Sequence, residues 1–166
     1  MLSTFNGLPV HPLLVHFIVA LAPLTGLLVI LCAIWPAARQ RLVWPTLALA
    51  AATAGMTPLV TESGEWLEHN IEKSELVERH AELGDTMIYF ALALLIAAIL
   101  VVVEHVRASR GKPLSTALTA VIAVFVVLAA AATTAQVVRI GHSGAESVWS
   151  GEVAATGSTG DSEAGE

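Results

Sequence analysis

Charged residues are scarce in this chain: they make up 13% of its 166 residues, whereas 55% are hydrophobic. A typical soluble domain carries about 25% charged residues. There is also a single cysteine, Cys32, which excludes a disulfide within the chain. The net charge of -6 argues against nucleic acid as a partner, because nucleic-acid-binding surfaces are basic. The shortage of charge points to the lipid bilayer as the environment and partner of this protein.

Four apolar stretches are each long enough to cross a bilayer, which takes about 20 residues. Lipid offers no hydrogen-bond partners, so each span must pair its own backbone groups, and the Ala, Leu and Val content suits helices better than barrel strands. The sequence therefore predicts an all-α, polytopic membrane protein with a four-transmembrane-helix bundle in residues 1–150. The expected spans are residues 13–35, 43–62, 84–104 and 115–139, followed by an acidic, disordered tail over residues 151–166.

Prolines refine the expected helix boundaries. A proline is best tolerated in the first turn of a helix, so the first helix should begin at Pro12 with His11 as its cap. The second helix should begin near Pro45 and run to about Asn70, with a kink at Pro58. No internal repeat is evident along the sequence.

Basic residues gather at one end of the predicted bundle. Five of the eight lie in the loops after the first and third spans: Arg39, Arg41, Arg107, Arg110 and Lys112. The opposite end has Lys73, Arg79 and Arg139. Because Lys and Arg are enriched in cytoplasmic loops, we expect a multi-pass protein of the cell membrane with both its N- and C-termini extracytoplasmic.

Histidine and glutamate concentrate at the extracytoplasmic end. Facing helices that contribute inward His and Glu side chains are how bundles build metal and cofactor sites. His16 is the strongest candidate, because it lies in an apolar helix and imidazole binds both transition metals and haem iron. Its alternative role is a hydrogen bond to a neighbouring helix. The candidate metal ligands are His11, His16, Glu62, Glu65, His69, His80 and His142.

Helix geometry limits which of these residues share one ion. Glu62, Glu65 and His69 lie on one helix face. Glu62 and His69 are nevertheless roughly 10 Å apart along the axis, too far to bind the same metal. The chelating pair is therefore Glu65 with His69, or Glu62 with Glu65. Arg139 is a candidate partner for Glu62 or Glu65, or for a haem propionate.

Two motifs resemble a bacterial family of four-helix membrane proteins of unknown function. They are His11-Pro12-Leu13-Leu14-Val15-His16-Phe17, and Gly141-His142-Ser143-Gly144-Ala145 followed by Val148-Trp149. The resemblance covers about residues 5–150. The plan of that family is similar to that of membrane b-type cytochromes, and some relatives are fused to Rieske or c-type cytochrome modules. The resemblance implies redox chemistry, by analogy.

Three functions follow as hypotheses. The first is a membrane electron-transfer protein with one b-type haem near the extracytoplasmic face, which exchanges electrons with a quinone or a respiratory partner protein. Its haem ligands would be His16 and either His80 or His142. The second is an extracytoplasmic metal-binding or transport protein without haem, in which Glu65 joins these histidines around a transition metal ion. The third is a structural accessory subunit of a respiratory membrane complex. A homo-oligomer is compatible with all three.

Overall fold

A computed structural model describes residues 4–5, 7–72 and 74–160 of the chain. Within these residues, four helical stretches are long and apolar enough to span a membrane, which confirms the prediction of an all-α, four-span membrane protein. A short antiparallel hairpin precedes them, in which β1 (Thr4–Phe5) pairs with β2 (Leu8–Pro9). The helices are α1 (His11–Ile34), α2 (Pro36–Glu68), α3 (Glu75–Asp85), α4 (Met87–Ser109) and α5 (Thr116–Gly160).

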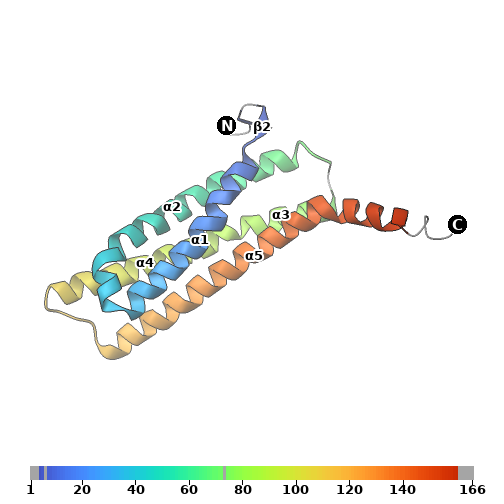
Figure 1. The fold of residues 1–166 in the computed structure, drawn as a ribbon. Coiled ribbons are helices and arrows are strands. Elements are labelled where there is room, and N and C mark those ends of the chain that lie inside the picture. The colour runs from blue at the N-terminus through green and yellow to red at the C-terminus, as the bar shows by residue number, and fades with distance from the viewer. Residues whose placement is uncertain (1–3, 6, 73, 161–166) are drawn as a thin grey trace.

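The spans form a bundle in which each has two close neighbours (Figure 1). α1 packs against α2 and α5, and α4 packs against the same two helices, so α1 and α4 occupy opposite corners. α3 continues the direction of α4 and packs against α5 and α2. The α1–α2 turn and the α4–α5 loop lie at one end of the bundle. The hairpin, α3 and the last turns of α5 lie at the other end.

Helix starts differ from the predicted ones at two prolines. α1 begins at His11 with Pro12 in its first turn, so the prediction that His11 caps this helix is wrong. α2 begins at Pro36 and includes both Pro45 and Pro58, so the predicted start near Pro45 is also wrong. A proline in the first turn loses no hydrogen bond, because the N–H groups there have no partner within the helix. Pro36 meets this condition as the first residue of α2.

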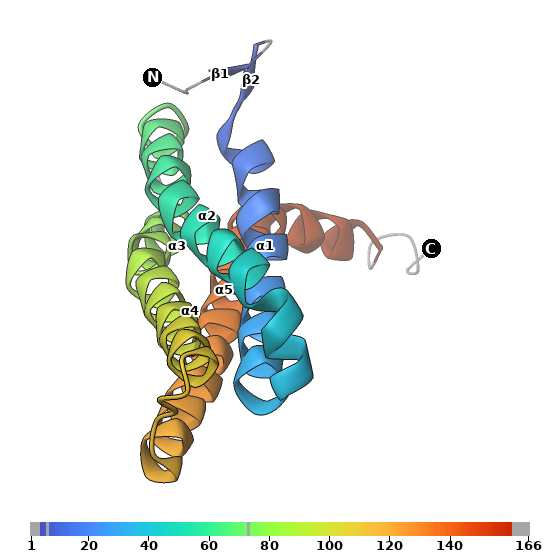
Figure 2. The same ribbon diagram turned by 90° about the vertical axis from the view of Figure 1, so that its left-hand side faces the viewer.

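α5 continues as a helix to Gly160, into the segment after residue 150 for which the composition predicts disorder. No proline between Thr116 and Gly160 interrupts its hydrogen-bond ladder. Its last turns project beyond the other helices (Figure 2). The rest of the predicted tail, residues 161–166, lies outside the described residues.

One break divides the third span, at Thr86 between α3 and α4. The Leu83 carbonyl there accepts hydrogen bonds from the Thr86 hydroxyl at 2.7 Å and from the Gln136 side-chain amide of α5 at 3.1 Å. Gln136 also donates to the Thr86 hydroxyl at 2.8 Å. Backbone groups freed inside a membrane need such partners. Gln136 thus stabilises the break and fixes the position of α3 against α5.

Candidate cofactor site

His11, at the start of α1, lies against α2. Its Nδ1 is 3.1 Å from the carbonyl oxygen of Val60 and 3.2 Å from Ser63 Oγ. Because a carbonyl oxygen only accepts, the bond to Val60 requires the proton to be on Nδ1. The ring also lies against Gly64, where a Cβ would be 2.9 Å from His11 Cε1. Gly64 therefore provides space that any other residue would fill.

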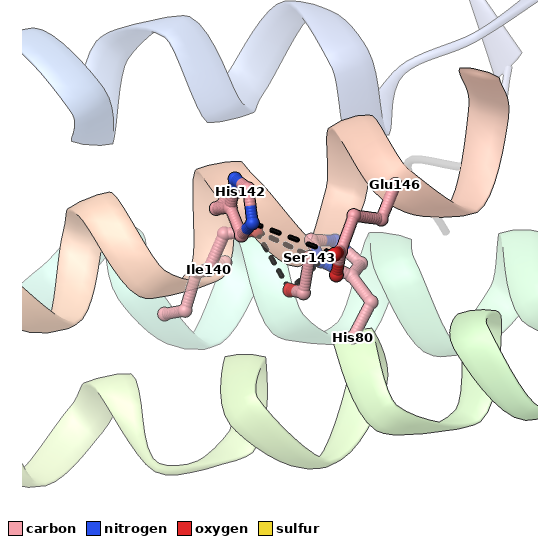
Figure 3. A network of polar contacts seen from close by, with 5 residues as sticks. All are labelled: His80, Ile140, His142, Ser143 and Glu146. Atoms are coloured by element: carbon pink, nitrogen blue, oxygen red, sulfur yellow. Dashed lines mark hydrogen bonds and ion pairs between the residues drawn. The ribbon is translucent and has the colours of Figure 1, made fainter. Parts of the chain in front are cut away.

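His80, on α3, makes the same set of contacts with α5 (Figure 3). Its Nδ1 is 3.1 Å from the carbonyl oxygen of Ile140 and 3.1 Å from Ser143 Oγ. A Cβ on Gly144 would be 2.9 Å from His80 Cε1. Both histidines are half-buried. Each ring therefore donates its Nδ1 proton to a neighbouring helix, and in the neutral form of the imidazole the free lone pair is on Nε2.

The two imidazoles are neighbours across a cavity. Their ring centroids are 6.4 Å apart and their planes form an angle of 79°. Both line a cavity of about 430 Å³ between α1, α2, α3 and α5. Among the residues that the structure describes, none forms a hydrogen bond with Nε2 of His11 or His80. The cavity is lined largely by apolar side chains, and Ile18, Met87 and Val137 of this lining also belong to a buried apolar cluster of the bundle.

Two of the other predicted ligands also line the cavity. His16 is exposed, and its Nδ1 donates to the Pro12 carbonyl of the preceding turn. Glu65 is exposed as well, and it is joined on the cavity wall by the carboxylates of Glu68 and Asp85. In the described part of the chain, no three His, Cys, Asp or Glu side chains form a group that could hold a metal ion. The predicted multi-residue metal site is therefore not assembled there.

The remaining candidates lie away from the His11–His80 pair. The His69 Nδ1 donates to the Glu65 carbonyl at 2.7 Å on the surface of α2. His142 is exposed on α5, with Nε2 3.4 Å from a carboxylate oxygen of Glu146 (Figure 3). Glu62 is exposed and does not line the cavity. Arg139 does not line it either, and its guanidinium donates to the Gln136 side chain at 3.3 Å.

Four membrane spans that present two neighbouring histidines in a cavity near one end define a polytopic membrane protein with a candidate cofactor site. Residues 7–157 match the family described as predicted membrane protein (DUF2231), and the chain belongs to this family. This confirms the resemblance drawn from the motifs at His11 and Gly141. No curated protein and no solved structure matches the chain. The likeness to membrane b-type cytochromes is outside these findings and stays a prediction.

Proposed function

We propose that this protein is a membrane redox protein that binds one b-type haem between His11 and His80. The number of ligands supports haem over a bare metal ion. A porphyrin supplies four nitrogen ligands to its iron, so the protein adds only one or two axial ligands. An ion such as Zn²⁺ takes at least three protein ligands. The described residues offer a pair of imidazoles and no group of three.

The distance between the rings supports the same assignment. Two imidazoles that each held one metal through a ring nitrogen, at about 2 Å, would have ring centres at most roughly 6 Å apart. The centroids of His11 and His80 are 6.4 Å apart. Rotating either ring about the line of such bonds leaves this separation unchanged. The 79° angle between the planes is therefore compatible with both rings holding the same group.

The hydrogen bonds of both histidines also suit ligation. A histidine that binds a metal commonly donates its other ring N–H to a carbonyl or carboxylate, which fixes its tautomer and orientation. His11 has the Val60 carbonyl in this role, and His80 has the Ile140 carbonyl. The cavity of about 430 Å³ falls within the size range of cofactor sites, and its mainly apolar lining suits a macrocycle.

A bound haem would supply reversible one-electron transfer. His11 and His80 would hold the cofactor at the end of the bundle that carries the hairpin and α3. That position allows exchange with a quinone in the lipid or with a partner protein at the surface. In this proposal His80 keeps the role predicted from the sequence, and His11 takes the place of His16.

The absorption spectrum and metal content of one preparation test the proposal. Full-length protein is purified without a metal-affinity tag from cells supplied with haem. We expect a Soret band, sharp α and β bands on reduction, and iron as the main transition metal. A colourless protein with stoichiometric zinc or copper would establish the metal-binding alternative instead. A protein with neither haem nor metal would overturn both and favour an accessory subunit.

We further propose that the cavity end and both termini face the extracytoplasmic side. The excess of Lys and Arg in the loops at the other end supports this orientation. Alkaline phosphatase fused to the C-terminus should be active, because it folds only outside the cytoplasm, and a green fluorescent protein fused there should stay dark. The reverse result would place the cavity on the cytoplasmic side.

A further inference from the structure

The two halves of the chain share one pattern of burial, although no repeat is evident from the sequence alone. Residues of α1 correspond to residues of α3 and α4 that lie 69 positions later, and residues of α2 correspond to residues of α5 that lie 80 positions later. The buried residues Ile18, Ala22, Thr25, Val29 and Cys32 thus match the buried Met87, Ala91, Leu94, Ala98 and Val101. Likewise Thr46, Ala50, Thr53, Thr57 and Ser63 match Val126, Ala130, Thr133, Val137 and Ser143.

The arrangement of the helices fits this correspondence. The matching spans α1 and α4 occupy opposite corners of the bundle, and so do α2 and α5 (Figures 1 and 2). Matching spans also run in the same direction. A half turn about the long axis of the bundle therefore exchanges the two halves approximately. Parallel repeats related by an axis along the membrane normal are an established plan in membrane proteins.

The residues of the candidate site are related by the same two offsets, 69 and 80 positions. His11 corresponds to His80, and the segment Val60 to Gly64 corresponds to the segment Ile140 to Gly144. The contacts are equivalent as well, since the distances from each histidine to the carbonyl oxygen, the serine Oγ and the glycine Cβ position agree within 0.1 Å. The cavity wall follows the repeat too: Pro12, Val15 and Ile18 line it together with the matching Ala81, Gly84 and Met87. The cavity therefore lies on the pseudo-twofold axis.

We propose that Ser63-Gly64 and Ser143-Gly144 are equivalent positioning residues of one ligand site on this axis. Each glycine allows an imidazole to lie directly against its helix, where a Cβ would come within 2.9 Å of the ring. Each serine is 4% exposed and donates to the carbonyl that also accepts the histidine Nδ1 proton. Each Ser-Gly pair thereby holds its histidine in the tautomer with a free Nε2. For haem as the ligand, this inference rests on the proposed function.

Alanine variants of the two glycines test the positioning role. In full-length protein from haem-supplied cells, Gly64→Ala and Gly144→Ala should each lower haem occupancy, with a loss of haem affinity of about tenfold or more, because losing the support of a metal-ligating histidine typically costs 10–100-fold in affinity. Equivalence predicts similar losses for both. Gly55→Ala on α2 is the matched control, since its Cβ would meet no atom within 4 Å, and it should retain haem. Normal occupancy in both cavity variants would overturn the positioning role.

Serine variants keep the test decisive if an added methyl group prevents folding. Ser63→Ala and Ser143→Ala remove one atom and overpack nothing, and Ser63→Thr should restore the contact because it keeps a hydroxyl. In haem-free protein labelled with ¹⁵N-histidine, NMR should show the Nδ1–H tautomer for His11 and His80. Ser63→Ala should change the signals of His11 and leave those of His80 unchanged, and Ser143→Ala should do the reverse. If the signals of both histidines stay unchanged in these variants, the positioning role is wrong.

The two proposals fail in different ways. If the protein binds no haem but each serine variant changes the signals of its own histidine, the positioning role stands and haem is the wrong ligand. If haem binds and neither glycine nor serine variants change its occupancy or the histidine tautomers, the proposed function stands and the positioning role is wrong.

Discussion

Replacing His80 with alanine is expected to abolish haem binding, and replacing His11 is expected to do the same. Each substitution removes one imidazole of the only histidine ring pair in contact among the described residues. His16 does not compensate, because it is exposed and, among the described residues, it forms no group of three potential ligands with the pair. The loss should exceed the roughly 10–100-fold effect of removing an outer partner of a ligand. Soret absorbance per mole of purified protein measures it.

Two histidines provide matched controls for this experiment. His69 and His142 are exposed at the same end of the bundle and do not line the cavity. His69→Ala and His142→Ala should therefore retain the haem and its band positions. If His142→Ala lost the haem while His11→Ala retained it, His11 and His80 would be excluded as the ligand pair, and the pair of His16 with His142, one of the two predicted from the sequence, would be favoured.

The four spans could be predicted because the bilayer imposes a simple rule on the sequence. A span must be apolar for about 20 residues and must pair its own backbone, so each appears as a continuous apolar run. The ends of the helices are harder to predict, because a helix can continue into water beyond the end of the apolar run. α2 therefore begins at Pro36, before the apolar run, and the break at Thr86 depends on Gln136, which is distant in the sequence.

The site could be predicted only as a set of residues at one end. Spacing along one helix tells which side chains share a face, as for Glu62, Glu65 and His69. It does not tell which faces meet. His11 and His80 become neighbours because α1 packs on α2 and α3 packs on α5. The sequence contained one indication of this contact, because the dipeptide Ser-Gly occurs at both 63–64 and 143–144. A Ser-Gly dipeptide alone does not predict a ligand site.

At the other end of the bundle, removing the Glu104 carboxylate is expected to lower the free energy of unfolding strongly. Arg39 of α2 forms an ion pair with Glu104 of α4, and the two side chains are only 15% and 8% exposed. Glu104→Ala leaves a charged guanidinium without its partner, and such losses cost about 3 kcal/mol or more. Arg39→Ala should also destabilise the protein, because it leaves the Glu104 carboxylate without its partner. Thermal unfolding in detergent micelles compares the variants.

A double-mutant cycle separates the ion pair from the other contacts of these residues. Once Glu104 is alanine, removing Arg39 also removes the unpaired charge, so the double variant should be more stable than the sum of the two single losses predicts. Arg107→Ala, an exposed cation at the same end, is the control and should unfold like the unsubstituted protein. The haem content of folded variants should not change, because the cavity lies at the opposite end. Strictly additive losses would show that the two charges act independently and that their pairing does not join α2 to α4.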